Sequence, residues 1–147
     1  MKKLMRKIIF AGSTGSGKTT LCQWLHGQEI AYKKTQAIES FDQAIDTPGE
    51  CIENRYLYKM LLVSSVDADV IGLVQDCTKE DSYFPPAFAT VFAKPVIGVV
   101  TKVELSESQE QIAQARAHLQ AAGVEQIFEV STIENVGVEA LQQYLEA

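Results

Sequence analysis

The segment Gly12-Ser-Thr-Gly-Ser-Gly-Lys-Thr19 sets the tightest limit on the fold of this chain. It matches the pattern G-x-x-x-x-G-K-[ST], whose glycines let the backbone turn its N–H groups toward an anion. An apolar run, Lys7–Ala11, precedes the segment, and residues 18–26 have helical character before Gly27. A strand, a glycine-rich turn and a helix in this order predict a loop that binds the phosphates of a nucleotide.

We call residues 12–19 the P-loop. The helix that begins near Lys18 adds the positive end of its dipole to the loop. Lys18 is expected to reach the β- and γ-phosphates and is a candidate catalytic residue, and Thr19 is expected to offer its hydroxyl to Mg²⁺. The candidate nucleotide-binding residues of this segment are Gly12, Ser13, Thr14, Gly15, Ser16, Gly17, Lys18, Thr19 and Thr20.

Short apolar runs alternate with helical patterns along the rest of the chain. Such runs predict buried strands, and their alternation with helices predicts a three-layer α/β fold with a mostly parallel sheet covered on both faces. A polar segment before Asp46 predicts one antiparallel edge strand. At 147 residues, we expect one P-loop NTPase domain. The expected strands include 69–76, 95–101 and 126–131, and the expected helices are 51–65, 106–122 with Ser106 as N-cap, and 137–145.

A second motif, Ile45-Asp-Thr-Pro-Gly49, has the strand-DxxG form that follows a P-loop in GTPases. Asp46 is expected to hold Mg²⁺ through water, and the Gly49 N–H is expected to meet the γ-phosphate. Thr35 is a further candidate metal ligand in the loop between the two motifs. Glu50 is a candidate base for water, or a first-turn acid that complements the next helix. A carboxylate beside the γ-phosphate predicts slow hydrolysis.

A third motif concerns the base of the nucleotide. Thr101-Lys-Val-Glu104 resembles the guanine-reading sequence Asn/Thr-Lys-x-Asp, with a carboxylate stem that is one methylene longer. A carboxylate suits the two N–H donors of guanine and is left unpaired by adenine, so we favour GTP/GDP, with ATP/ADP as the alternative. Thr101 is expected to brace the P-loop, and Lys102 is expected to lie along the base. Ser131 and Thr132, after the last strand, are expected to face guanine O6.

Composition excludes several other classes of function. The formal net charge of −6 leaves no basic surface for nucleic acid. The apolar run behind the basic N-terminal residues is too short for a signal sequence or a membrane span. Three cysteines without a paired spacing favour a reducing cytoplasm over disulfides or structural zinc.

Several segments together resemble the EutP/PduV family of ethanolamine- and propanediol-utilisation proteins. They are GSTGSGKTTL, YKKTQAI, IDTPGE with ENRYLY, VIGLV, PVIGVVTK and GVEALQQYL, and they span essentially the whole chain. The resemblance implies a compact Ras-like protein of the bacterial cytoplasm that is associated with microcompartments, whose shell or enzymes are candidate partners. It also implies phosphate and Mg²⁺ roles for the P-loop, Thr35 and Asp46, and a base role for Lys102. Glu104 departs from the aspartate that family members often carry.

Three functions remain open at this point. The first is a slow GTPase-like switch whose loops respond to the γ-phosphate. The second is an ATP-dependent phosphotransferase acting on a small carboxylate, although the three arginines and the absence of a lid-like insertion speak against it. The third is a non-catalytic accessory protein of a microcompartment.

Overall fold

The computed structural model describes residues 6–12, 15–25, 39–40, 44–46, 55–79 and 84–146. A six-stranded sheet has the order β2-β3-β1-β4-β5-β6. All neighbouring strands are parallel except β2, which pairs antiparallel with β3. The strands are β1 (Ile8–Gly12), β2 (Glu39–Ser40), β3 (Ala44–Asp46), β4 (Val70–Asp76), β5 (Val96–Thr101) and β6 (Ile127–Glu129).

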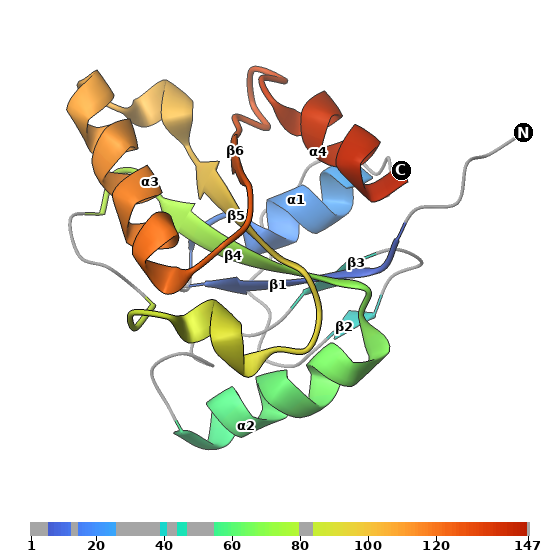
Figure 1. The fold of residues 1–147 in the computed structure, drawn as a ribbon. Coiled ribbons are helices and arrows are strands. Elements are labelled where there is room, and N and C mark those ends of the chain that lie inside the picture. Colours follow the sequence, from blue (N-terminus) through green and yellow to red (C-terminus); the bar gives the residue numbers. More distant parts are fainter. Residues whose placement is uncertain are drawn as a thin grey trace, which may run out of the picture.

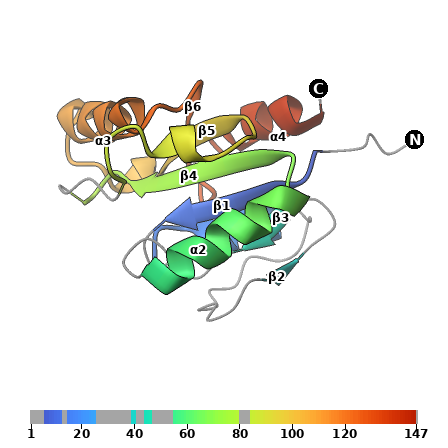
Figure 2. The same cartoon turned by 60° about the horizontal axis from the view of Figure 1, so that its bottom comes forward.

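Helices cover both faces of the sheet, as Figures 1 and 2 show. Successive side chains of a strand point to opposite faces, so Ile9 and Ala11 join one apolar cluster and Ile8 and Phe10 the other. The first cluster contains side chains of α2 (Arg55–Ser64) and α3 (Gln109–Ala122), and the second contains side chains of α1 (Lys18–Leu25) and α4 (Val138–Glu146). The expected three-layer α/β fold is therefore confirmed.

Three short 3₁₀ turns complete the described elements: η2 (Ser65–Asp67), η3 (Phe88–Val91) and η4 (Val103–Leu105). The turn η4 corrects the predicted start of a helix. Ser106 ends η4, and its hydroxyl donates to Val103 O at 2.8 Å. Helix α3 begins at Gln109 with Ser108 as its N-cap, so the assignment of Ser106 as N-cap was wrong.

The last predicted strand is shorter than expected. β6 ends at Glu129, although Val130 N still donates to Val100 O at 2.8 Å. Beyond β6, Ser131 and Val136 form an isolated antiparallel bridge outside the six strands. Among the described helices, none has the length and apolar character needed to cross a bilayer.

The parallel arrangement determines where the predicted motifs lie. The P-loop follows β1, and the DxxG motif follows β3. The base motif begins at the end of β5, next to β4 in the sheet. Carboxyl ends of parallel strands share one edge, which is where ligands of such sheets bind.

Candidate nucleotide-binding site

The described part of the P-loop has the backbone of a tight turn. Gly15 and Gly17 have φ values of +82° and +105°, a region that residues with a Cβ rarely adopt. A Cβ at Gly12 would lie 2.6 Å from Val74 O, so the first glycine permits close contact between β1 and β4. The sequence therefore places glycine where this turn and this contact require it.

Lys18 is the first residue of α1, and its side chain is buried. Its Nζ donates to Gly12 O at 3.0 Å, so the side chain folds back along the P-loop. Thr19 and Thr20 follow in the first turn of the same helix. The ammonium group and the N-terminal end of α1 both bring positive charge to the loop.

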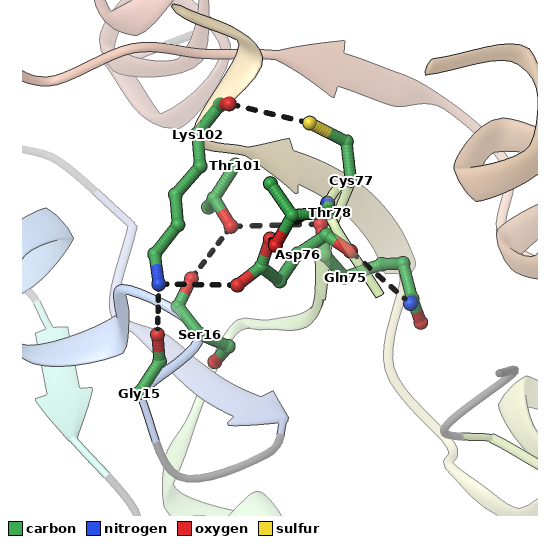
Figure 3. Close-up of polar contacts among 8 residues, drawn as sticks. All are labelled: Gly15, Ser16, Gln75, Asp76, Cys77, Thr78, Thr101 and Lys102. Carbon is green, nitrogen blue, oxygen red and sulfur yellow. Dashed lines mark hydrogen bonds and ion pairs between the residues drawn. The ribbon is translucent and has the colours of Figure 1, made fainter. Parts of the chain in front are cut away.

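Lys102 connects the base motif to the P-loop, as Figure 3 shows. Its Nζ donates to Gly15 O at 2.6 Å and lies 3.1 Å from Asp76 Oδ2. Lys102 itself has a φ of +61°, and this left-handed residue turns the chain from β5 into η4. One side chain thus connects the ends of β4 and β5 with the loop after β1.

Asp76 is a residue of the site that we did not predict from the sequence. Its side chain is 2% exposed, and Oδ1 accepts hydrogen bonds from Thr78 N at 2.8 Å and Thr78 Oγ1 at 2.6 Å. The Lys102 ammonium compensates the charge of this buried carboxylate. A signal was available in the sequence, since Asp76 directly ends a strand that is otherwise almost entirely apolar.

Thr101 makes the expected contact with the P-loop. Its side chain is buried, and Oγ1 donates to Ser16 O at 2.6 Å. The nearest atom to a Cβ built on Gly17 would be Thr101 Cγ2, at 3.5 Å. The side chain therefore supports two successive residues of the loop.

This contact gives a stability prediction. Thr101→Val keeps the shape of the side chain but removes the donor to Ser16 O, so we expect the free energy of unfolding to fall by about 1–2 kcal/mol. Urea denaturation measures this free energy for the variant and for the unaltered protein. Thr90→Val is the matched control, because exposed Thr90 donates in the same way to Ala87 O at 2.7 Å and should lose less than about 0.5 kcal/mol. Equal losses at the two positions would contradict the special role of Thr101.

A cavity of about 200 Å³ lies beside these contacts. It is lined by residues of α1, of the base motif and of the loop after β6. The Oε2 atom of Glu104 is buried and has no hydrogen-bond partner among the described residues. The predicted site residues that line this cavity are Gly17, Thr20, Thr101, Lys102, Glu104 and Thr132.

Cys77, the residue after β4, contacts the base motif. Its Sγ donates to Lys102 O at 3.2 Å. Burial raises the pKa of the Cys77 thiol, and the negative charges of Asp76 and Glu104 raise this pKa further. The thiol therefore stays protonated at neutral pH and acts as a donor that holds the left-handed turn at Lys102.

The loop after β6 is held by local contacts. Ser131 and Val136 exchange two backbone hydrogen bonds of 2.9 Å each, and Ser131 Oγ accepts from Glu134 N at 3.1 Å. Asn135 has a φ of +56°, and its Oδ1 accepts a hydrogen bond of 3.2 Å from Trp24 Nε1 on α1. The loop that carries Thr132 is thus tied to the helix that follows the P-loop.

Several predicted site residues lie outside the described part of the chain. For Asp46 only the backbone is described. It ends β3 opposite Phe10 of β1, and β3 lies in contact with α1. Asp46 and Thr19 therefore come from neighbouring elements at the carboxyl edge of the sheet. The residues outside the described ranges are Ser13, Thr14, Thr35, Gly49 and Glu50.

Comparison with known proteins decides the family. The family model described as "Ethanolamine utilisation - propanediol utilisation" matches residues 5–147. The chain belongs to this PduV-EutP family. The family resemblance inferred from the sequence motifs is confirmed.

Two relatives are similar to this chain over nearly its full length. It is 41% identical over 143 residues to "Propanediol utilization protein PduV" of Citrobacter freundii, covering 97% of this chain and 95% of that protein. It is 33% identical over 144 residues to "Probable acetate kinase EutP" of Escherichia coli K12, covering 96% and 89%. Each alignment extends over nearly the full length of both proteins.

Two solved structures have the same fold. One is the Roco2 RocCORdC protein of Methanosarcina barkeri bound to GDP, with a TM-score of 0.61 and 20% identity over 99% of this chain and 49% of that one. The other is Era in complex with MgGDPNP and a segment of 16S ribosomal RNA, with a TM-score of 0.67 and 19% identity over 97% and 57%. At these identities the likeness concerns the fold, which is that of a Ras-like G domain.

Proposed function

We propose that this protein binds guanine nucleotides with Mg²⁺ and acts as a slow GTPase-like switch in ethanolamine or propanediol utilisation. The observation that carries the proposal is the buried Oε2 of Glu104, which has no partner within the described residues and belongs to a side chain that lines the cavity beside the P-loop. A buried acceptor without a donor costs free energy, and guanine brings N–H donors to such a carboxylate.

Adenine fits this carboxylate poorly. Its N1 is an acceptor, and it lacks the exocyclic amine that guanine carries beside N1. Adenine in the cavity would leave Glu104 without a donor and would place a lone pair against a negative charge. The same chemistry supports GTP and GDP over ATP and ADP.

The phosphates would lie against the P-loop. Lys18 would exchange its contact with Gly12 O for the β- and γ-phosphates, and the N-terminus of α1 would face the same charge. Lys102, held by Gly15 O and Asp76, would fix the distance between the phosphate and base subsites.

The residues present suit a magnesium ion. The Thr19 hydroxyl and the Asp46 carboxylate are oxygen ligands of the kind that Mg²⁺ prefers, on neighbouring elements, and Thr35 is the candidate third protein ligand. When bound, the ion would supply positive charge that offsets the negative charge of the phosphates. The negative charge of Glu50 after the DxxG motif supports slow hydrolysis.

Titration calorimetry tests this proposal. Nucleotide-stripped protein is titrated with GDP and with ADP in the presence of Mg²⁺. We expect GDP to bind about ten-fold or more tightly than ADP. Equal or tighter binding of ADP would overturn the guanine assignment.

A second candidate function is phosphoryl transfer from ATP to a small carboxylate. It is favoured by the name of the EutP relatives, "Probable acetate kinase", one of which is 33% identical to this chain. The reaction moves the γ-phosphoryl group to a carboxylate oxygen and releases the nucleoside diphosphate. To distinguish phosphoryl transfer from hydrolysis, the protein is incubated with ATP or GTP and acetate. Hydroxylamine then traps any acetyl phosphate that has formed. A microcompartment accessory role would give neither product.

A further inference from the structure

The carboxylate at the end of β4 has hydrogen-bond donors on both of its oxygens. Asp76 Oδ1 accepts from Thr78 N at 2.8 Å and from Thr78 Oγ1 at 2.6 Å, and Asp76 Oδ2 lies 3.1 Å from Lys102 Nζ. The side chain is buried, so these neighbours, and not a ligand, determine its orientation. A buried ion pair adds little to stability, because the loss of hydration offsets the attraction between the charges. Stability alone therefore does not account for an aspartate at this position.

The carboxylate keeps a mobile side chain in one place. Lys102 Nζ donates to Gly15 O at 2.6 Å and contacts Asp76 in the same position, as Figure 3 shows. The Lys102 side chain is 35% exposed, so water competes for its ammonium group. Fixing a long lysine side chain also costs conformational entropy. A hydrogen bond to one neutral carbonyl compensates this cost poorly, whereas a carboxylate adds a stronger, charge-assisted contact.

The contact with Gly15 O determines the direction of the next N–H group. A peptide group is planar and trans, so its C=O and N–H bonds point in opposite directions. Lys102 holds Gly15 O on the side of β4 and β5, and the N–H of Ser16 therefore points away from these strand ends. Thr101 Oγ1, which donates to Ser16 O at 2.6 Å, orients the N–H of Gly17 in the same manner. Successive N–H groups fixed in this way form a concavity that binds anions.

We propose that Asp76 is a positioning residue for phosphate binding by the P-loop. It holds Lys102 against Gly15 O and thereby fixes the N–H of Ser16 in the direction of the phosphates. Asp76 itself touches no ligand, so its effect is the same for every ligand that carries phosphates, whatever the base. The inference rests on the proposed function in one respect, since it requires phosphates on the P-loop, but it does not require guanine.

Asp76→Asn tests this role. The carboxamide oxygen can still accept from Thr78, but the N–H₂ group then faces the Lys102 ammonium, donor against donor. The charge that loses its partner belongs to the partly exposed lysine, which water can solvate, so the fold should persist. We expect the affinities for inorganic tripolyphosphate, GDP and ADP, each with Mg²⁺, to fall by the same factor of about ten in titration calorimetry.

Asp69→Asn is the matched control. Asp69 directly precedes β4, is exposed, and accepts a hydrogen bond of 2.8 Å from Lys7 N that a carboxamide oxygen can also accept. It should leave these affinities unchanged. The amide NMR resonance of Ser16 in the ligand-free protein reports on the direction of this N–H group. We expect it to shift in Asp76→Asn and to stay in place in Asp69→Asn.

A double substitution shows whether Asp76 acts through Lys102. Asp76→Asn combined with Lys102→Met should bind tripolyphosphate about as weakly as Asp76→Asn alone, because the lysine holds Gly15 O in neither variant. A further loss of about ten-fold would show that Lys102 acts without Asp76 and would overturn the proposal. Unchanged or tighter tripolyphosphate binding by Asp76→Asn also overturns it, and so does a loss without a shift of the Ser16 resonance.

The outcomes separate the role of Asp76 from the guanine assignment. If the unaltered protein binds ADP as tightly as GDP and Asp76→Asn weakens tripolyphosphate, guanine preference is overturned and the role of Asp76 is supported. If the unaltered protein prefers GDP and Asp76→Asn leaves tripolyphosphate binding unchanged, the role of Asp76 is overturned and guanine preference stands. An unaltered protein that binds neither tripolyphosphate nor nucleotide overturns both.

Discussion

Replacing Glu104 by glutamine should lower the affinity for GDP by about 30-fold and should not weaken the binding of ADP, because the carboxamide removes the negative charge and offers an N–H₂ donor to adenine N1. Guanine offers two donors side by side, N1–H and the exocyclic amine. A carboxylate has an acceptor for each of them, whereas a carboxamide has one acceptor oxygen and one N–H₂ donor. In either orientation of the amide, a donor of the base faces a donor of the protein.

The same chemistry predicts a gain for a third base. Xanthine has a carbonyl oxygen where guanine has its amine, so it presents a donor and an acceptor side by side. A glutamine at position 104 matches this pair, and we expect Glu104→Gln to bind the xanthine diphosphate better relative to GDP than the unaltered protein does. Calorimetry with GDP, ADP and xanthosine diphosphate measures all three affinities.

Glu107→Gln is the matched control for this experiment. It makes the same chemical change three residues later, at a side chain that is exposed. We expect it to leave the GDP to ADP ratio unaltered. If Glu104→Gln also left this ratio unaltered, Glu104 would not contact the base, and the buried Oε2 would need another explanation.

Much of the fold and of the candidate site can be predicted from residue patterns within short segments of the sequence. The P-loop is recognisable because its glycines, Lys18 and Thr19 lie close together in one short segment of the sequence. The apolar runs at β4 and β5 identify buried strands because parallel strands covered on both faces carry little polar pattern. The contact of Thr101 with the P-loop was predicted from the base motif, which begins at the last residue of β5.

Other features depend on contacts between distant residues. Asp76 pairs with Lys102 because β4 and β5 align Asp76 with Thr101, and a register cannot be read from either strand alone. The start of α3 shows the limit of local signals. Ser106 and Ser108 are both suitable N-caps, but Ser106 donates to Val103 O in the preceding turn. The structure of the turn η4 therefore determines that Ser108, and not Ser106, is the N-cap of α3.

Replacing Lys18 by methionine should weaken binding of GDP and of inorganic tripolyphosphate by about 100-fold each, with Mg²⁺ present. Lys18 lies at the start of α1, with its Nζ against Gly12 O, and is the buried cation of the described P-loop residues. Methionine retains an unbranched apolar stem and removes the charge. The loss should be equal for the two ligands, because the ammonium group acts on phosphate and not on the base.

The comparison of Lys18 with Glu104 separates the two halves of the site. Lys59→Met is the control for charge removal, since Lys59 is exposed on α2 and should alter neither affinity. Thermal midpoints without ligand show whether the variants fold alike. If Lys18→Met weakens GDP alone and spares tripolyphosphate, the lysine acts on something other than phosphate. If it weakens both while Glu104→Gln weakens only GDP, phosphate affinity and base choice reside in different residues that Lys102 connects through Gly15 O.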